Sequence, residues 1–161
     1  ECWNIDKLEG VGNGPTDIDT TGFRLVYDYM GNFNDELPDK YFDVVFSIST
    51  LEHVPEDDKG IHSDILKDIN RVMKTGGYSM HCIDVVWKND FIWMNKIISY
   101  FFEHAGTVNE FIPPLEMIKD SELFVMSEEY FKQTWQVTTK KLYQDFGKPI
   151  SYNVLWQKKR G

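Results

Sequence analysis

Two side chains that could accept a proton follow apolar stretches of the sequence. His53 comes a few residues after the stretch Phe42–Ile48, and an imidazole that titrates near neutral pH can serve as a general base. His53 could equally cap the following helix or anchor a loop. Asp84 lies near the end of a second stretch, residues 78–86, and could therefore contact a substrate. We predict His53 and Asp84 as candidate catalytic residues.

The remaining histidines indicate structure rather than chemistry. His81 lies within the second apolar stretch, where we expect a hydrogen-bonded core histidine. His62 and Asp64 are close to His53 in sequence, but their spacing matches no recognised set of ligands. We therefore expect no metal site.

The elements that position these residues form a strand, a helix and a strand. Residues 42–48 are almost continuously apolar, which is typical of a strand covered on both faces. Residues 57–74 have helical spacing, which places Asp68 among the solvent-facing polar residues, and Gly76-Gly77 is expected to end the helix. Residues 78–86 return as a strand. Connections this short predict a right-handed parallel crossover.

Weaker signals surround this unit. Residues 2–5 and 23–29 are strand-like, and a helix is predicted from residue 90 to about residue 104. Residues 112–115 are predicted to be an extended spacer, and Ser127 to cap another helix. Residues 137–143 and 151–157 are predicted to form an antiparallel hairpin. The fold class is therefore α/β, a Rossmann-like doubly wound and mostly parallel sheet with a C-terminal antiparallel hairpin, in one domain of residues 1–161.

A series of motifs runs through the central unit. It comprises Leu37-Pro38, YFDVVFS at residues 41–47, LEHV at residues 51–54 and INRVMKTGGY at residues 69–78. In order and spacing, the series resembles class I S-adenosylmethionine-dependent methyltransferases. The close resemblance covers about a quarter of the chain.

The resemblance implies a cofactor, S-adenosylmethionine, and the residues around it. Asp6 matches the acid that takes the two ribose hydroxyls. Asp28 matches the acid that accepts from the adenine amino group, with Tyr29 or Met30 covering the ring. Either acid could instead simply end its strand. Residues at the carboxyl ends of parallel strands meet at one crevice. Three residues at the end of the Phe42–Ile48 strand are therefore further candidates for contact with the cofactor: Ser47, Ile48 and Ser49. Residues 87–126 lie where the superfamily often carries a cap or lid over the acceptor, although core packing and a dimer surface also suit this apolar segment.

The glycine loop departs from the family pattern. Gly10, Gly12 and Gly14 alternate as expected, but only residues 15–23 separate them from the next strand. A parallel crossover needs about a dozen residues or more. We therefore expect an ordinary flexible loop, with residues 2–6 as the family's second strand and its first strand, glycine loop and helix absent. This predicts a truncated chain, a rearranged sheet with residues 2–5 in the central slot, or edge pairing with a second subunit.

Composition narrows the class of protein. Hydrophobic residues make up 42% of the 161 residues, which argues for one folded domain. The net charge of −9 argues against nucleic acid, and we expect the basic run at residues 158–160 to be a solvated terminus. No apolar run is long enough for a membrane span. Cys2 and Cys82 suggest no disulfide framework, which suits the reducing cytoplasm.

The favoured interpretation is a cytoplasmic S-adenosylmethionine-dependent methyltransferase that acts on a small-molecule or sugar-type acceptor. The alternative is a methyltransferase-like module without catalysis that serves assembly or interaction, with a homodimer as one form. A Rossmann-type dehydrogenase is weakened because no G-x-G-x-x-G follows a strand and opens a helix.

Overall fold

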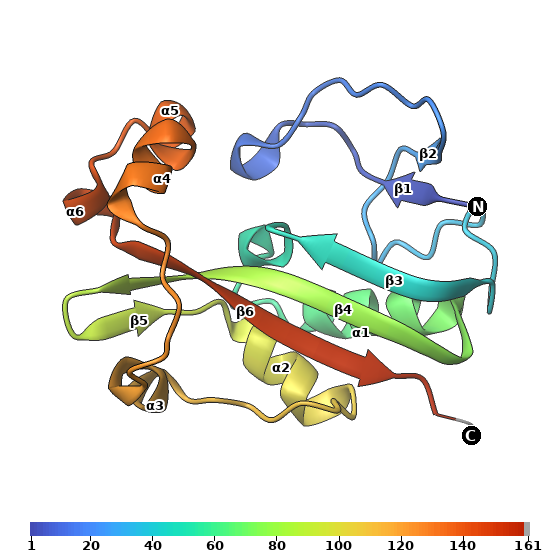
Figure 1. Cartoon of the computed structure of the whole chain (residues 1–161). Coiled ribbons are helices and arrows are strands. Elements are labelled where there is room, and N and C mark those ends of the chain that lie inside the picture. The colour runs from blue at the N-terminus through green and yellow to red at the C-terminus, as the bar shows by residue number, and fades with distance from the viewer. Residues whose placement is uncertain (160–161) are drawn as a thin grey trace.

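The centre of the fold is the predicted crossover unit. The computed structural model describes residues 1–159, so the last residue of the predicted basic run, Arg160, lies outside it. Strand β3 (Phe42–Ile48) is followed by helix α1 (Lys59–Val72) and strand β4 (Met73–Lys88). β3 and β4 are parallel. The unit is therefore confirmed, with α1 beside the two strands (Figure 1).

Helix α1 forms where the sequence predicts it and ends earlier. The Asp58 side chain caps it by accepting from the Ile61 N–H at 3.1 Å. The helix ends at Val72, and Gly76 and Gly77 lie within β4, so the prediction that they end the helix is wrong. Gly76 has a φ of 84° next to a shift in the β3–β4 register. The two glycines therefore accommodate an irregularity in the strand.

Strand β4 pairs with each of the other three strands of the main sheet. Strand β6 (Lys148–Gln157) runs antiparallel along it, and β5 (Phe91–Trp93) forms a short antiparallel hairpin with its end. The α/β class is thus correct, but the sheet is mixed, since β3 with β4 is its one parallel pair in the described chain.

A second, smaller sheet holds the N-terminal strands. β1 (Trp3–Ile5) pairs in parallel with β2 (Arg24–Val26), and a short 3-10 turn, η1 (Val11–Asn13), lies in the connection between them. Within residues 1–159, β1 pairs with β2 alone. Of the three alternatives that the sequence left open, a rearranged sheet with residues 2–5 in the central slot is therefore contradicted. Figure 1 shows the small sheet beyond β3, on the side away from β4.

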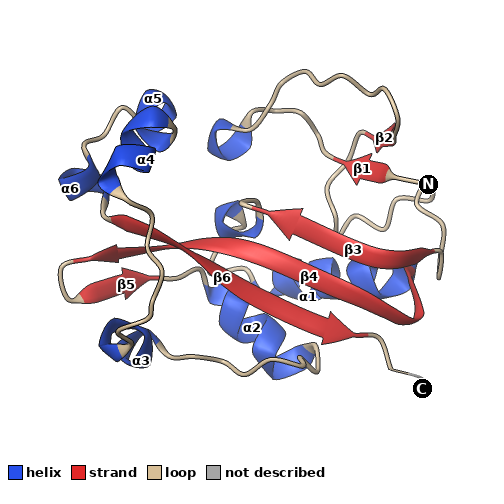
Figure 2. Ribbon diagram, viewed as in Figure 1, coloured by secondary structure: helices blue, strands red, loops and turns tan. Residues whose placement is uncertain are grey.

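The two faces of the main sheet differ. Helix α1 and helix α2 (Lys96–His104) cover one face and bury a core that includes Ile69, Ile83, Phe101 and Trp156 (Figure 2). Side chains alternate across a strand, so the neighbours of the core residues point to the opposite face. There the sheet exposes five large apolar side chains: Val44, Phe46, Ile48, Tyr78 and Met80. We call this set the open face.

The C-terminal hairpin is not present. Of the residues predicted as its first strand, 137–139 lie in helix α5 (Trp135–Thr139), 140–142 connect the two helices, and 143 begins helix α6 (Tyr143–Phe146), so the prediction for 137–143 is wrong. The reason is an aromatic cluster, because Trp135, Tyr143 and Phe146 all pack around the buried ring of Phe131. The second predicted strand, 151–157, is confirmed as part of β6.

The other helices differ in their boundaries. The helix predicted from residue 90 begins only at Lys96, where Asn95 caps it by accepting from the Ile97 N–H at 2.9 Å. The extended spacer at 112–115 is partly wrong, since α3 (Pro114–Lys119) begins within it. The Ser127 cap is confirmed at the start of α4 (Glu128–Gln133). The proposed lid at 87–126 stays a prediction.

Candidate cofactor and proton-transfer site

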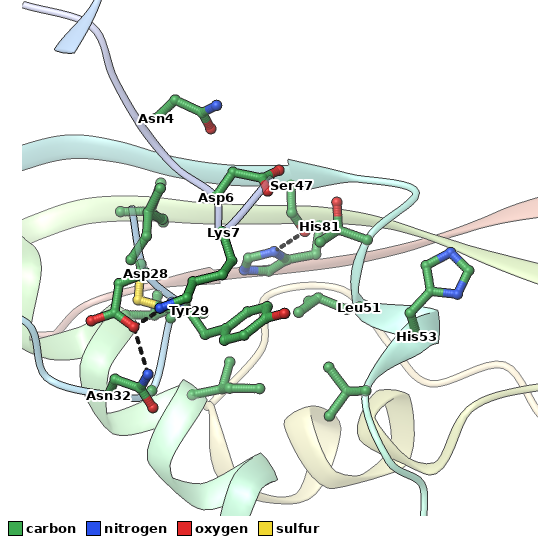
Figure 3. A pocket seen from close by; sticks show the side chains of 18 of the residues that line it. Asn4, Asp6, Lys7, Asp28, Tyr29, Asn32, Ser47, Leu51, His53 and His81 are labelled. Carbon is green, nitrogen blue, oxygen red and sulfur yellow. Dashed lines mark hydrogen bonds between the residues drawn. The ribbon is translucent and has the colours of Figure 1, made fainter. Parts of the chain in front are cut away.

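A cavity lies between the small sheet, strand β3 and helix α1. Its volume is about 910 Å³ (Figure 3), within the range of small-molecule sites. The structure brings together here every residue predicted to contact the cofactor: Asp6, Asp28, Tyr29, Met30, Ser47, Ile48 and Ser49. His53 also lines the cavity, whereas Asp84 does not.

Asp6 directly follows β1 and is held by the backbone. Its N–H donates to the Val26 carbonyl at 3.1 Å, which extends the β1–β2 ladder. Its Oδ1 accepts from the Leu8 N–H at 2.6 Å, and Leu8 has a φ of 52°, so the chain turns sharply around the carboxylate. Among the described residues Oδ2 has no hydrogen-bond donor. It is the oxygen through which Asp6 could accept from a ligand.

Asp28 follows β2 and is surrounded by donors. Oδ1 accepts from the Tyr29 N–H at 2.8 Å and the Asn32 amide at 2.6 Å, and Oδ2 accepts from the Asn34 amide at 2.8 Å. The Asn34 and Asn32 amides hold the pKa of Asp28 below its ordinary value. Each carboxylate oxygen has two lone pairs, so Oδ2 keeps one for a ligand.

Asp68 holds the loop that carries Asp28. It is fully buried, so the predicted solvent-facing position is wrong. Oδ2 accepts from the Gly31 and Phe33 N–H groups at 2.8 and 3.0 Å, and Oδ1 from Arg71 Nε at 2.9 Å. Arg71 also donates to the Leu37 carbonyl at 2.7 Å. Together the two side chains tie the loop after β2 to α1.

Tyr29 links the loops after β1 and β2. Its hydroxyl donates to Glu9 Oε2 at 2.7 Å, and this hydrogen bond raises the pKa of the phenol. Its ring is exposed at the cavity, whereas Met30 is half-buried and packs on the core. Tyr29 is therefore the more accessible of the two residues predicted to cover a ring.

His81 fixes Ser47 in the cavity wall. Its Nδ1 lies 2.8 Å from Ser47 Oγ and its Nε2 2.8 Å from Ser79 Oγ. Burial lowers the pKa of His81 to about 4, so the ring is neutral near pH 7 and one nitrogen donates while the other accepts. The ring also stacks on Trp156, with 5.0 Å between centroids. The prediction of a hydrogen-bonded core histidine is confirmed.

Two carboxyl groups meet beside the cavity, where β3 and β4 approach their carboxyl ends. The Asp84 N–H donates to Glu52 Oε2 at 3.4 Å, and His53 Nε2 lies 3.5 Å from Glu52 Oε1. Burial raises the pKa of Glu52 to about 7, and the charge of Asp84 adds to this. Burial raises the pKa of Asp84 as well. Glu52 was not among the residues predicted from the sequence, where its place directly before His53 was the available signal.

The glycine loop, residues 10–14, contacts His53. Gly10 and Gly12 have φ values of 71° and 62°, which favour glycine. A Cβ on Gly12 would lie 2.0 Å from His53 Nε2. Residues 10–14 thus form a turn whose backbone contacts the imidazole, and the flexibility of this loop stays a prediction.

Two further expectations concern ions and membranes. Among the residues that the structure describes, no group of three or more His, Cys, Asp or Glu side chains could hold a metal ion. In the same part of the chain, no helix combines the length and the apolar character that a membrane crossing requires.

Comparison with known proteins identifies the class. Residues 21–80 match the family model described as "Methyltransferase domain". This segment holds β2, β3, α1 and the start of β4, and with them Asp28, Ser47 and His53. The match confirms the resemblance to class I S-adenosylmethionine-dependent methyltransferases and, with it, methyltransferase as the enzyme class.

One solved structure provides a further comparison. A SAM-dependent methyltransferase from Archaeoglobus fulgidus is 19% identical to the chain, with a TM-score of 0.47 over 85% of this chain and 68% of that chain. A search of curated proteins finds no match.

Proposed function

We propose that the chain binds S-adenosylmethionine in the cavity and transfers its methyl group to a small-molecule or sugar-type acceptor. The observation that carries the proposal is the convergence of three strand ends. Asp6 after β1, Asp28 after β2 and Ser47 near the end of β3 all line one cavity. Ligands of open α/β sheets bind beyond the carboxyl ends of the strands.

The residues present fit an adenosyl group. Asp6 Oδ2 offers an acceptor for sugar hydroxyls, and Asp28 Oδ2 offers one for an amino group. Ile48 and Leu51 add apolar surface to the wall, which suits a purine ring. When bound, the cofactor would supply a methyl group on a positively charged sulfur. The protein's part is alignment, because holding two reactants in place removes much of the entropic barrier.

Isothermal titration with S-adenosylhomocysteine tests cofactor binding. In the Asp6→Asn variant the amide oxygen can still accept from Leu8, but the charged acceptor is lost. Hydrogen bonds to charged groups contribute about 1.5–3 kcal/mol, so we expect affinity to fall roughly 10- to 100-fold. Asp17→Asn, in an exposed part of the same loop, is the control and should bind like the parent. No heat and no thermal shift with the parent chain would refute cofactor binding.

The open face favours a second candidate, a methyltransferase-like module that serves assembly. Phe46 and Ile48 are 61% and 63% exposed, and Val44 lies beside them on an edge of the sheet that has no strand partner in the described residues. Contiguous exposed apolar patches mark interaction sites. A dimer that forms with increasing concentration, in a chain with no affinity for S-adenosylhomocysteine, would favour this candidate.

A further inference from the structure

We propose that Asp84, with Glu52 as its proton-sharing partner, removes the proton from the methyl acceptor, and that the acceptor is therefore a hydroxyl or N–H compound that reacts as it loses this proton. The inference rests on the proposed function and deepens it. Asp84 lies on β4, on the same face of the sheet as Tyr78 and Met80. It lies past the point where β3 ends. It is only partly buried, so it can meet an acceptor, whereas Glu52 lies behind it with a side chain 5% exposed.

The surroundings of the pair distinguish it from a structural ion pair. In the turn η2 (Leu51–His53), the partly exposed His53 has its Nε2 3.5 Å from Glu52 Oε1. Within the described residues, no lysine or arginine forms an ion pair with Glu52 or Asp84. Ser49 at the end of β3 hydrogen-bonds Asp84, and Ser151 of β6 lies opposite it.

A buried carboxylate elsewhere in the same protein shows the contrast. Asp68 is matched by Arg71 and by two backbone N–H groups. In the described part of the chain Glu52 pairs with His53 but with no lysine or arginine, and two neighbouring acids without a permanent cation disfavour the doubly ionised state. Such an arrangement costs stability and is typical of functional sites. Burial raises the pKa of Glu52 to about 7, and burial raises the pKa of Asp84 as well, so the two carboxyl groups titrate together.

The position of the pair suits methyl transfer. Ser49 and His53 contact it and also line the cavity, so the pair lies next to the site proposed for the cofactor. The acceptor oxygen or nitrogen forms a bond to the methyl carbon while the carbon–sulfur bond breaks. The electron pair of that bond stays on sulfur, which becomes a neutral thioether, and the acceptor's proton passes to the carboxyl pair.

Carbon-13 NMR of the side-chain carboxyl groups in the ligand-free protein tests the pair directly. We expect Glu52 to titrate with a midpoint near pH 7, and the midpoint of Asp84 to lie above that of a free aspartate. In Glu52→Gln the midpoint of Asp84 should fall, because the second carboxylate is gone. Asp57→Asn, an exposed acid in the segment between η2 and α1, is the control and should leave the midpoint unchanged. Midpoints below pH 5 for both groups would overturn the inference.

Methyl transfer to phenols of graded acidity tests the role. A base is needed only while the phenol keeps its proton. Glu52→Gln and Asp84→Asn should therefore lower kcat about 10²- to 10⁴-fold for protonated phenols and change it little for phenols already ionised. Equal losses for both kinds of phenol, with S-adenosylhomocysteine still bound, would overturn the inference. Failure of the parent chain to bind S-adenosylhomocysteine would refute the proposed function instead, and the NMR midpoint would still decide whether the pair shares a proton.

Discussion

Replacing Asp68 by alanine should destabilise the protein and open the cavity wall. The carboxylate is fully buried and holds the Gly31 and Phe33 N–H groups and Arg71 Nε. Each buried donor left without a partner costs about 1–3 kcal/mol. Arg71 keeps its hydrogen bonds to the Leu37 carbonyl and to Asp39, so the free-energy cost of removing its bond to Asp68 is smaller. We expect Asp68→Ala to lower the free energy of unfolding by about 3–5 kcal/mol.

Urea denaturation of matched variants measures this effect. Asp43→Ala is the control, because its pair with Lys74 is exposed and such pairs contribute about 0–1 kcal/mol. Since the loop held by Asp68 carries Asp28, a folded Asp68→Ala protein should also bind S-adenosylhomocysteine more weakly. A loss of stability no greater than that of Asp43→Ala would refute the argument that this carboxylate holds the loop.

Two more predictions concern the cavity wall. Gly12→Ala should displace His53 and shift the NMR signals of its ring. Gly22 also has a positive φ but has open space around it, so Gly22→Ala should leave these signals in place. Identical spectra for the two variants would contradict the contact between Gly12 and His53. His81 should titrate near pH 4 by proton NMR. Because its folded pKa is depressed, the stability that depends on its neutral form is complete above about pH 6.5 and is lost as the pH falls through about 4, by roughly 3 kcal/mol at most. A His81→Gln variant should lose less stability over this interval, and an equal loss would show that His81 is not the group responsible.

Local sequence patterns predicted the part of the fold whose contacts are close in sequence, the unit of β3, α1 and β4. The periodicities of β3 and α1, and the short connections between them, leave a parallel crossover as the one arrangement that buries both apolar faces. The position of Ser47 at the carboxyl end of a predicted parallel strand placed it at the crevice, whereas Asp28 was located by the family resemblance. Both residues line one cavity although β2 and β3 belong to separate sheets, an arrangement that the sequence did not predict.

The features that the sequence did not predict depend on partners distant in the chain. Residues 137–143 have strand-like composition, yet the ring of Phe131 draws them into helices. Asp68 occupies a polar position of α1 but is buried because a loop 35 residues away folds over it. Glu52 shows the same effect, since its burial depends on β4. Periodicity within one helix carries no information about what covers its polar side.

The acids around the cavity have different roles because their surroundings differ. Asp28 receives three hydrogen bonds from neutral donors, which favour the charged carboxylate, and its pKa falls. Glu52 is buried next to another acid, and its pKa rises to about 7. One side chain therefore stays an acceptor at all working pH values, while the other can exchange a proton. Acids whose pKa values are driven apart in this way are candidates for different roles. Under the proposed function, Asp28 would accept a hydrogen bond from the cofactor and Glu52 would exchange a proton with Asp84.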